Sequence, residues 1–226
     1  MSGKALKLIQ PVSKRDQVVA SFKEAILSGI IQPGESIVES KIAQQLGAGI
    51  PLVREALIEL EHQGYVQKVP YKGTTVTKQE QPDVEKIFRL RVELESLAIE
   101  WAKENVTPAD IEDLRNITAK MKEGARAHDL DQFYQNDLAF HRKLWEMSGN
   151  EYLVECLERI VAPLFAFFLM KDRRERESYL FSAAQHEKIV EALPKLSEAK
   201  LCALMRDSIS DWRTEVFNAV LPRDKD

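Results

Sequence analysis

The sequence predicts a mostly α-helical protein: an N-terminal winged helix-turn-helix domain with a small β-hairpin wing, followed by an all-α bundle of six or seven helices. Three observations favour this fold. Residues 39–60 form two short amphipathic patterns around a glycine turn, and residues 65–77 hold two strand-like runs around a second turn. After residue 80, apolar residues recur at helical spacing with no strand pattern. We place the two domains at residues 10–79 and 80–222.

The helix-turn-helix pattern occupies residues 39–60 and follows an earlier amphipathic helix that closes before the turn Gln32-Pro33-Gly34. Its first helix is expected to end at Gly47. Its second is expected to begin at Pro51, because a proline in the first turn of a helix costs no hydrogen bond. The apolar residues expected to face the core of this domain are Val18, Val19, Phe22, Ile26, Leu27, Ile42, Ala43, Leu46, Val53, Ala56, Leu57 and Leu60.

The hairpin that follows decides how this pattern is interpreted. By apolar pattern alone, an ordinary helical hairpin in an α-helical core is the simpler reading. The runs Tyr65–Val69 and Thr74–Thr77 are typical of strands, however, and Pro70–Gly73 forms a basic turn with a glycine tip between them. Two helices followed by such a hairpin are typical of a winged helix, which is a DNA-binding domain.

The second domain is predicted from helix start and stop signals. Thr107-Pro108 is a helix cap followed by a first-turn proline, and Gly149-Asn150 ends a helix. The expected helices cover about residues 81–104, 108–127, 130–147, 152–170, 177–193 and 198–220. The first of them runs through the apolar residues Ile87, Leu90, Leu94, Leu97 and Ala98.

Charge is divided unequally between the domains. The whole chain of 226 residues has a net charge of −4. Residues 1–80 contain ten Lys and Arg against eight Asp and Glu, whereas the rest of the chain contains 22 against 28. The small positive excess lies in the domain that would meet phosphates, so we expect DNA binding that depends on dimerisation and is weakened by salt.

The cysteines and apolar runs indicate a cytoplasmic protein that spans no membrane. Cys156 and Cys202 are too few and too far apart for a disulfide framework or a zinc motif, and we expect them to be buried thiols. Residues 1–14 lack an apolar stretch long enough for a signal peptide. The longest apolar run, residues 160–170, is shorter than the roughly 20 residues that cross a bilayer.

One group of side chains in the second domain suits metal chemistry. Asp137 and His141 are four residues apart in one predicted helix, so they project from the same face and could chelate a divalent ion. By itself such a pair is more often a surface hydrogen bond or ion pair. His186 lies in another predicted helix, where a lone histidine is more often a satisfied core residue than a ligand.

A family resemblance is carried by residues 14–78. Its motif positions are Ile26, Gly29, Pro33-Gly34, Ile42-Ala43, Leu46-Gly47, Val53-Arg54-Glu55-Ala56-Leu57, Leu60, Gly64 and Gly73. In order and spacing they resemble the DNA-binding domain of the GntR family of bacterial transcription regulators. The resemblance implies an N-terminal domain that binds a palindromic double-stranded DNA operator as a homodimer.

The resemblance fails at the start of the recognition helix. Family members usually have Ser-Arg-Thr-Pro there, and this chain has Gly49-Ile50-Pro51-Leu52. Isoleucine cannot hydrogen bond to a base edge or phosphate, so we expect altered operator specificity or lower affinity. Arg54 is the best candidate for a retained contact, with a salt bridge to Glu55 or Glu59 as the alternative. The candidate DNA-binding residues are Ser40, Lys41, Gly49, Ile50, Pro51, Arg54, Lys72 and Gly73.

Residues 83–220 resemble the helical effector domain of the FadR-type branch. The matching runs are residues 91–95, residues 137–141 and the pattern His186, Ile189, Ala192-Leu193. Most members of this branch bind a metal through one aspartate and three histidines, and an organic acid lies on or beside the ion. The resemblance makes Asp137, His141 and His186 metal ligands, whereas Ser208 stands where the third histidine is expected.

The serine leaves two interpretations open. Three protein ligands and water still suit zinc, nickel or manganese, and we expect the metal to be retained because two of the three imidazoles remain. The alternative is a cavity that has lost the metal and binds its effector through polar side chains. Arg91 and Ser208 are the candidate effector-binding residues. Arg91 could hold a carboxylate bidentately or pair with Glu95 on its own helix.

The sequence therefore predicts a regulator, more specifically a repressor, whose operator affinity is controlled by a small carboxylate-bearing metabolite. The alternatives are a metal-dependent hydrolase or lyase that uses Asp137, His141 and His186, and a DNA-binding domain joined to a purely structural bundle. No nucleophile or general-base motif supports an enzyme, and an enzyme would leave the winged helix unexplained.

Overall fold

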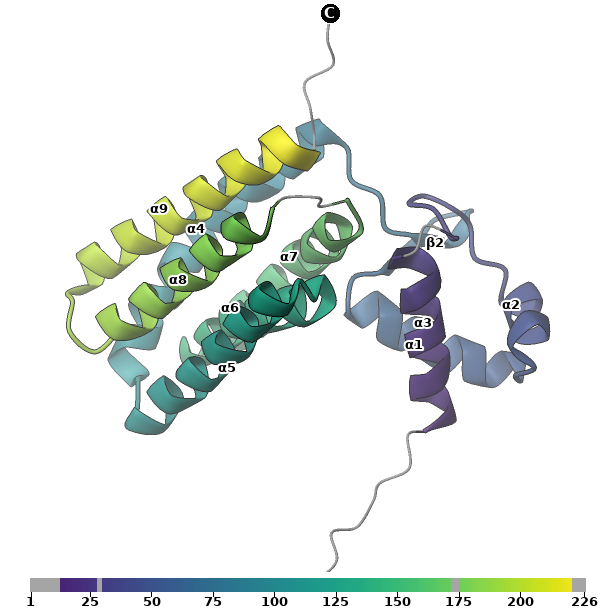
Figure 1. Cartoon of the computed structure of the whole chain (residues 1–226), viewed down its shortest axis with the longest axis horizontal. Helices are drawn as coiled ribbons and strands as arrows, with labels where there is room; N and C mark the ends of the chain where they lie inside the picture. The colour runs from purple at the N-terminus through teal and green to yellow at the C-terminus, as the bar shows by residue number, and fades with distance from the viewer. Residues whose placement is uncertain (1–12, 28–29, 172–174, 221–226) are drawn as a thin grey trace, which may run out of the picture. The chain divides into compact units, whose positions relative to one another are not determined.

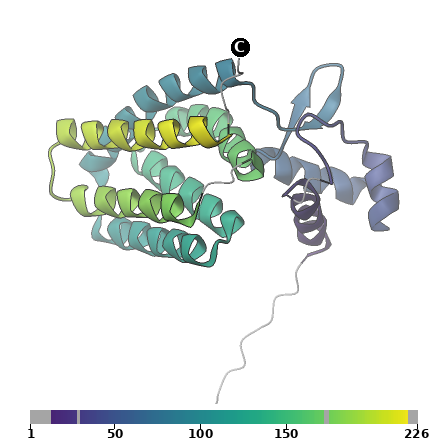
Figure 2. The ribbon, with the colours of Figure 1, turned by 45° about the horizontal axis from the view of Figure 1, so that its top comes forward.

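The structure is a computed structural model that describes residues 13–27, 30–171 and 175–220. The chain divides into two compact units, Met1–Val76 and Thr77–Asp226. Figures 1 and 2 show the helices, which make up most of the described chain, and one small hairpin. The predicted fold class, a winged helix-turn-helix domain followed by an all-α domain, is confirmed. Residues 10–12, 28–29, 172–174 and 221–222 of the expected domains and turns lie outside the described residues.

The first unit contains three helices and a hairpin. The helices are α1 (Lys14–Leu27), α2 (Glu39–Leu46) and α3 (Ile50–His62), and the strands are β1 (Val66–Val69) and β2 (Gly73–Val76). The strands pair antiparallel, with Val66 opposite Val76 and Val69 opposite Gly73. Residues 34–37 run beside β2, where Ile37 donates its backbone N–H to the carbonyl of Thr74. The predicted helix-turn-helix and wing are both present.

Two turns of this unit use backbone conformations that explain their sequences. Gly47 ends α2 with φ +59°, a left-handed conformation that glycine adopts without strain. Pro51 lies in the first turn of α3, as the sequence predicts.

The buried residues of α3 are Val53, Ala56, Leu57 and Leu60, and α3 packs against α1. In α2, however, Leu46 is 40% exposed, so its predicted place in the core is wrong. The helix is so short that Ala43 alone among its residues is fully buried.

The second unit consists of six helices within the described residues. They are α4 (Gln81–Asn105), α5 (Pro108–Ala127), α6 (Leu130–Met147), α7 (Glu151–Lys171), α8 (Arg176–Ala192) and α9 (Glu198–Val220). Figures 1 and 2 show α9 beside α4, against which it packs. Helix α5 packs against both α6 and α8. Thr107 caps α5 through a reciprocal pair of hydrogen bonds with Asp110.

The buried face of α4 includes two charged residues. Leu90 and Leu97 are 48% and 38% exposed, whereas Arg91 and Glu95 are buried. Arg91 and Glu95 enter the interior as an ion pair. Arg91 thereby lies next to His141 of α6.

Two further expectations concern the cysteines and the long apolar run. Cys156 is exposed on α7 and Cys202 is half-buried, so the expectation that both thiols are buried is wrong. Cys156 lies on the outward face of α7, opposite Leu153 and Leu157. The apolar run does lie inside the bundle, with Pro163 within the helix. Among the described residues, every helix is too short or too polar to cross a membrane.

Candidate metal and effector site

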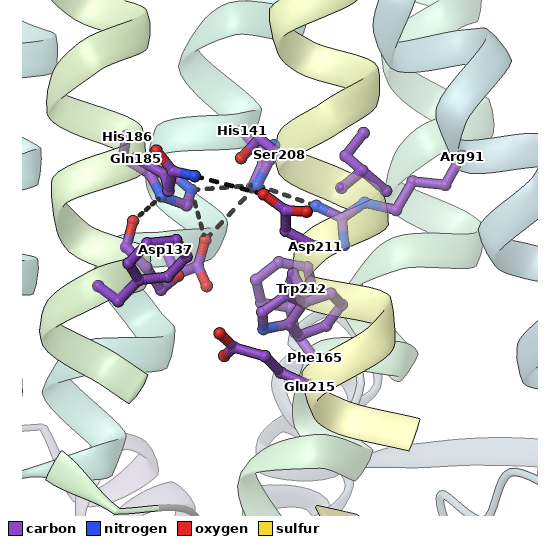
Figure 3. Close-up of a pocket in the computed structure, with 13 residues that line it drawn as sticks. Arg91, Asp137, His141, Phe165, Gln185, His186, Ser208, Asp211, Trp212 and Glu215 are labelled. Atoms are coloured by element: carbon purple, nitrogen blue, oxygen red, sulfur yellow. Dashed lines mark hydrogen bonds and ion pairs between the residues drawn. The ribbon is translucent and has the colours of Figure 1, made fainter. Parts of the chain in front are cut away.

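Five helices of the second unit, α4 and α6 to α9, line one small cavity (Figure 3). Helix α6 contributes Asp137 and His141 from consecutive turns, and α8 contributes His186. Arg91 of α4 and Ser208 of α9 line the same cavity. All five side chains that the sequence proposes for metal or effector binding are therefore brought together.

The two histidines have defined tautomers because each uses Nδ1 as a donor. His186 Nδ1 donates to the backbone carbonyl of Ser182 at 2.8 Å. His141 Nδ1 donates to the carboxylate of Glu95, which is itself buried. Both Nε2 atoms are then left with lone pairs that face the cavity. Fixing the remote ring nitrogen in this way is how proteins orient histidines that bind metals.

Three lone-pair atoms converge between α6 and α8. Asp137 Oδ1 lies 3.0 Å from His186 Nε2 and 3.5 Å from His141 Nε2, and the two Nε2 atoms are 3.4 Å apart. The Asp137 contacts are too poorly directed to be hydrogen bonds, so Oδ1 is a buried acceptor without a donor in the described structure. Ligand atoms about 2.1 Å from a tetrahedral zinc ion are separated by roughly 3.4 Å. The three residues thus fit a divalent cation.

Arg91 is the positive charge next to this group. Its Nε pairs with Glu95, and its Nη2 donates to His141 Nε2 at 2.9 Å. The pairing with Glu95 that the sequence left open is therefore observed, and Arg91 lines the cavity as well. Its Nη1 is buried without a hydrogen-bond partner in the described structure. A guanidinium N–H in this position can donate to a bound anion.

Electrostatics keep the buried carboxylates ionised. Burial by itself would raise the pKa of Glu95, but Arg91 and His141 outweigh burial and lower it to about 2. For Asp137, burial likewise raises the pKa, and His186 and His141 more than reverse this effect. A carboxylate that stays charged in a buried site is the form that binds a cation.

An aromatic wall closes the cavity beside Arg91. The guanidinium carbon of Arg91 lies 5.0 Å from the ring centres of Phe165 and Trp212, which stack on each other. The cavity volume is about 20 Å³, which is room for an ion or a water molecule. A metabolite would therefore require side chains of this wall to move.

Sequence reasoning named Glu95 only as a partner of Arg91 and did not place Trp212 at this site. Glu95 holds both Arg91 and His141, and its position four residues after Arg91 on one helix was the available signal. Trp212 contributes a buried indole Nε1 without a hydrogen-bond partner in the described structure. A lone tryptophan in an amphipathic helix is ordinarily a core residue, so the sequence around Trp212 gives no sign that its indole lines a cavity.

The candidate DNA-binding residues of the first unit are all exposed. They lie in α2, at the start of α3 and at the wing tip: Ser40, Lys41, Gly49, Ile50, Pro51, Arg54, Lys72 and Gly73. Arg54 pairs with Glu39 of α2, with Nη2 2.7 Å from the carboxylate. The alternative of a salt bridge with a nearby carboxylate is therefore observed, but the partner is Glu39 on the adjoining helix and not Glu55 or Glu59.

Two family models match the chain. One, described as bacterial regulatory proteins of the gntR family, matches residues 14–76. The other, described as the FCD domain, matches residues 86–211, which is more than half of the chain. The two matches fall on the winged helix-turn-helix unit and on the helical unit that contains the cavity.

Similar proteins are regulators. The transcriptional regulator McbR of Escherichia coli is 30% identical over 149 residues, covering 66% of this chain and 67% of McbR. The gluconate operon transcriptional repressor of Bacillus subtilis is 23% identical over 216 residues, covering 93% of this chain and 88% of that repressor. A solved structure of McbR superimposes with a TM-score of 0.71 at 22% identity, over 92% of this chain and 99% of the other, and supports the fold. These relatives point to a non-enzymatic regulator and away from a hydrolase or lyase.

Proposed function

Since the chain belongs to the gntR family of bacterial regulatory proteins and carries an FCD domain, we propose that this transcriptional regulator is a repressor controlled by a small carboxylate-bearing metabolite. Residues 10–79 bind the operator, and residues 80–222 bind the effector and pair two copies of the chain. The protein acts in the cytoplasm, where its operator lies. Repression is supported by the names of relatives such as the gluconate operon repressor.

The observation that carries the proposal is the convergence of three lone pairs in the cavity. Asp137 Oδ1, His141 Nε2 and His186 Nε2 lie within 3.5 Å of one another, and Arg91 Nη2 donates to His141 Nε2. Asp137 Oδ1 is a buried acceptor without a donor in the described structure, and burying it is costly unless a cation satisfies it. These residues would hold zinc, nickel or manganese, which would supply a Lewis-acidic anchor for the effector's carboxylate.

The chain's own residues then recognise the effector. Arg91 offers its unpartnered Nη1 to a carboxylate, while Glu95 holds the Nε side of the guanidinium in place. Ser208 lines the cavity at the position where the family has a histidine, and its smaller side chain leaves space and offers a hydroxyl group. Because the cavity is small, effector binding must shift Trp212, Phe165 or a helix, and that shift is what couples the site to the DNA-binding units.

Operator binding is proposed to use a homodimer. The first unit presents α3, with Arg54, and the wing tip, with Lys72 and Gly73, on its surface. Two such units contact the half-sites of a palindromic operator. Helix α4 supplies an apolar stripe at heptad spacing for pairing, formed by the exposed Leu90 and Leu97 and the half-buried Ile87 and Leu94.

Metal content tests the site directly. We expect near-stoichiometric metal in protein purified without a metal-affinity tag, and loss of that metal in His141→Ala. His62→Ala is the matched control, because His62 is an exposed histidine of the other unit. Its metal content should stay that of the parent.

Two outcomes would contradict parts of this proposal. Equal metal in the parent and His141→Ala, or none in either, would exclude the ion and leave Arg91 to bind the effector. Failure of every organic acid to change the protein's affinity for its operator would exclude control by a carboxylate metabolite, whatever the metal content.

A further inference from the structure

An exposed isoleucine begins the second helix of the helix-turn-helix. Ile50 is the first residue of α3 and is 42% exposed, whereas the apolar residues further along α3 at Val53, Ala56 and Leu57 are buried. In helix-turn-helix proteins this second helix enters the major groove of DNA, and the residues at its N-terminal end reach the edges of the bases. Ile50 therefore stands at a position from which a side chain contacts bases.

The turn that leads to Ile50 leaves space in front of α3. Apart from neighbours in the chain, a Cβ placed on Gly49 would meet only a side-chain carbon of Pro51 among the described residues, at 3.7 Å. A Cβ placed on Gly47 would meet no described atom within 4 Å. The turn from α2 to α3 consists of two glycines and an alanine, so its side chains do not block the approach of a base pair to Ile50.

A basic residue lies one turn further along α3. Arg54 follows Ile50 by four residues, so the two side chains are neighbours on the helix surface. Arg54 contacts Glu39 at 2.7 Å, and its side chain remains 63% exposed. A guanidinium can donate hydrogen bonds to guanine or to phosphate, whereas an aliphatic side chain makes only apolar contacts. The start of α3 therefore offers DNA one hydrogen-bonding and one apolar side chain.

The major groove offers one apolar group for such a side chain. Thymine presents a methyl group there, whereas adenine, guanine and cytosine present hydrogen-bond donors and acceptors. An isoleucine packed against a donor or acceptor would remove that group from water without replacing its hydrogen bond, which costs free energy. Packed against a methyl group, it would bury apolar surface on both sides. The exposed side chain of Ile50 therefore favours thymine over the other three bases.

We propose that Ile50 packs against the methyl group of one thymine in each operator half-site and is a specificity-determining residue of this regulator. This inference rests on the proposed function, because it specifies part of the DNA sequence that the operator-binding unit recognises. Arginine at this position would instead donate two hydrogen bonds to guanine. The exposed isoleucine thus changes the preferred base from guanine to thymine.

Removing a single methyl group from the DNA tests the contact. The operator is first selected from a random library of DNA duplexes with the full-length protein, and each thymine is then replaced by uracil in both half-sites. Uracil keeps the base pair and lacks only the methyl group. At one symmetric position, we expect uracil to weaken binding about fourfold for each half-site, as measured by fluorescence anisotropy. Ile50→Ala should bind the thymine and uracil duplexes equally.

Two further variants make the assignment specific. Ile58→Ala removes another exposed isoleucine of α3, roughly 12 Å further along the helix, and it should retain the full effect of uracil. Ile50→Arg supplies the donors that match guanine, so a second selection with this variant should yield guanine in place of the thymine.

The outcomes separate this inference from the proposed function. Equal binding of every uracil duplex, or an effect of uracil that persists in Ile50→Ala, would overturn the contact and leave operator binding intact. Loss of the uracil effect in Ile58→Ala as well, or selection of the same thymine by Ile50→Arg, would overturn the role of Ile50 in choosing the base. Failure of the protein to select any DNA sequence would overturn operator binding itself, and this inference with it.

Discussion

Single charged residues in buried positions define the candidate site. Arg91 and Glu95 are both within 1% of full burial, and an ion pair there costs more desolvation than apolar side chains of similar size would. A contribution to stability therefore does not explain why this ion pair is buried. Its contacts do explain it, since Glu95 orients His141 and Arg91 faces the cavity.

Asp110 provides a residue whose contribution depends on pH. Lys143 and the capping residue Thr107 lower its pKa to about 2. A carboxyl whose pKa is lower in the folded than in the unfolded state, where it is about 3.9, stabilises fully above that unfolded value. Asp110→Asn should lower the free energy of unfolding by about 1 kcal/mol at pH 7. The difference should shrink between about pH 4 and pH 2, as urea denaturation at several pH values can measure.

The matched control for this substitution is Glu112→Gln. Glu112 lies two residues away on α5, is exposed, and makes only a 3.7 Å contact with Arg115. It should change stability little at any pH. An effect of Asp110→Asn that persists unchanged at pH 2.5 would show that lost packing, not lost charge, is responsible.

Arg54 is the residue on α3 where a DNA contact is most directly measurable. Its guanidinium is 63% exposed and held by Glu39, which positions it on the helix surface. Arg54→Ala should weaken operator binding about tenfold or more and make it less dependent on salt. Arg115→Ala, which removes an exposed arginine from the helical unit, is the charge-matched control. Equal behaviour of the two variants in fluorescence anisotropy would exclude the contact.

At the scale of elements, helices α5 and α6 approach closely at a glycine. A Cβ on Gly124 would lie 2.8 Å from the backbone nitrogen of Phe133 and 3.1 Å from the carbonyl oxygen of Asp129. Those atoms belong to the backbone at the start of α6 and cannot rotate away. The turn therefore requires glycine for space, whereas most helical glycines could be replaced by alanine with a gain in stability.

Replacing a helical glycine by alanine ordinarily stabilises a protein, but this contact predicts that Gly124→Ala destabilises it. Gly124→Ala should lower the free energy of unfolding by about 1 to 3 kcal/mol, because α5 and α6 must separate. Ala119→Gly, at an exposed position of the same helix, gives the scale of helix propensity alone, roughly 0.5–1 kcal/mol. Thermal or chemical denaturation compares them. Increased stability of Gly124→Ala would mean that the close approach relaxes easily.

For the whole molecule, operator binding is proposed to depend on the pairing of two copies. The first unit carries only a small positive excess, so a single unit should bind DNA weakly, and two half-sites should act together. The proposed pairing surface is the stripe Ile87, Leu90, Leu94 and Leu97 on α4, the helix whose adjoining face carries Arg91 into the cavity. In this proposal, one helix joins effector binding to dimerisation.

The combined variant Leu90→Glu with Leu97→Glu tests that surface. Like charges placed at the centre of a symmetric interface should yield monomers in sedimentation experiments and weaken operator binding, while metal content and helicity persist. Tyr152→Glu, at a position 73% exposed on α7, is the control. Monomers from the control and dimers from the α4 variant would place the interface elsewhere.

Local patterns were sufficient for the elements and the fold class. Helix spacing, the cap at Thr107 and the wing between Tyr65 and Thr77 depend on residues close in sequence, and the observed boundaries lie within a few residues of the predicted ones. Asp137 and His141 were also identifiable, because a spacing of four residues places two side chains on one helical face.

The tertiary structure decided which charged residues are buried and what they meet. The apolar pattern of α4 gives no sign that Arg91 and Glu95 are buried, which is possible because they compensate each other's charge and both contact His141 on α6. The position of Trp212 beside Arg91 likewise depends on helices distant in sequence. Hydrophobic periodicity measures the average preference of a helix face, whereas a binding site consists of exceptions that only packing between helices creates.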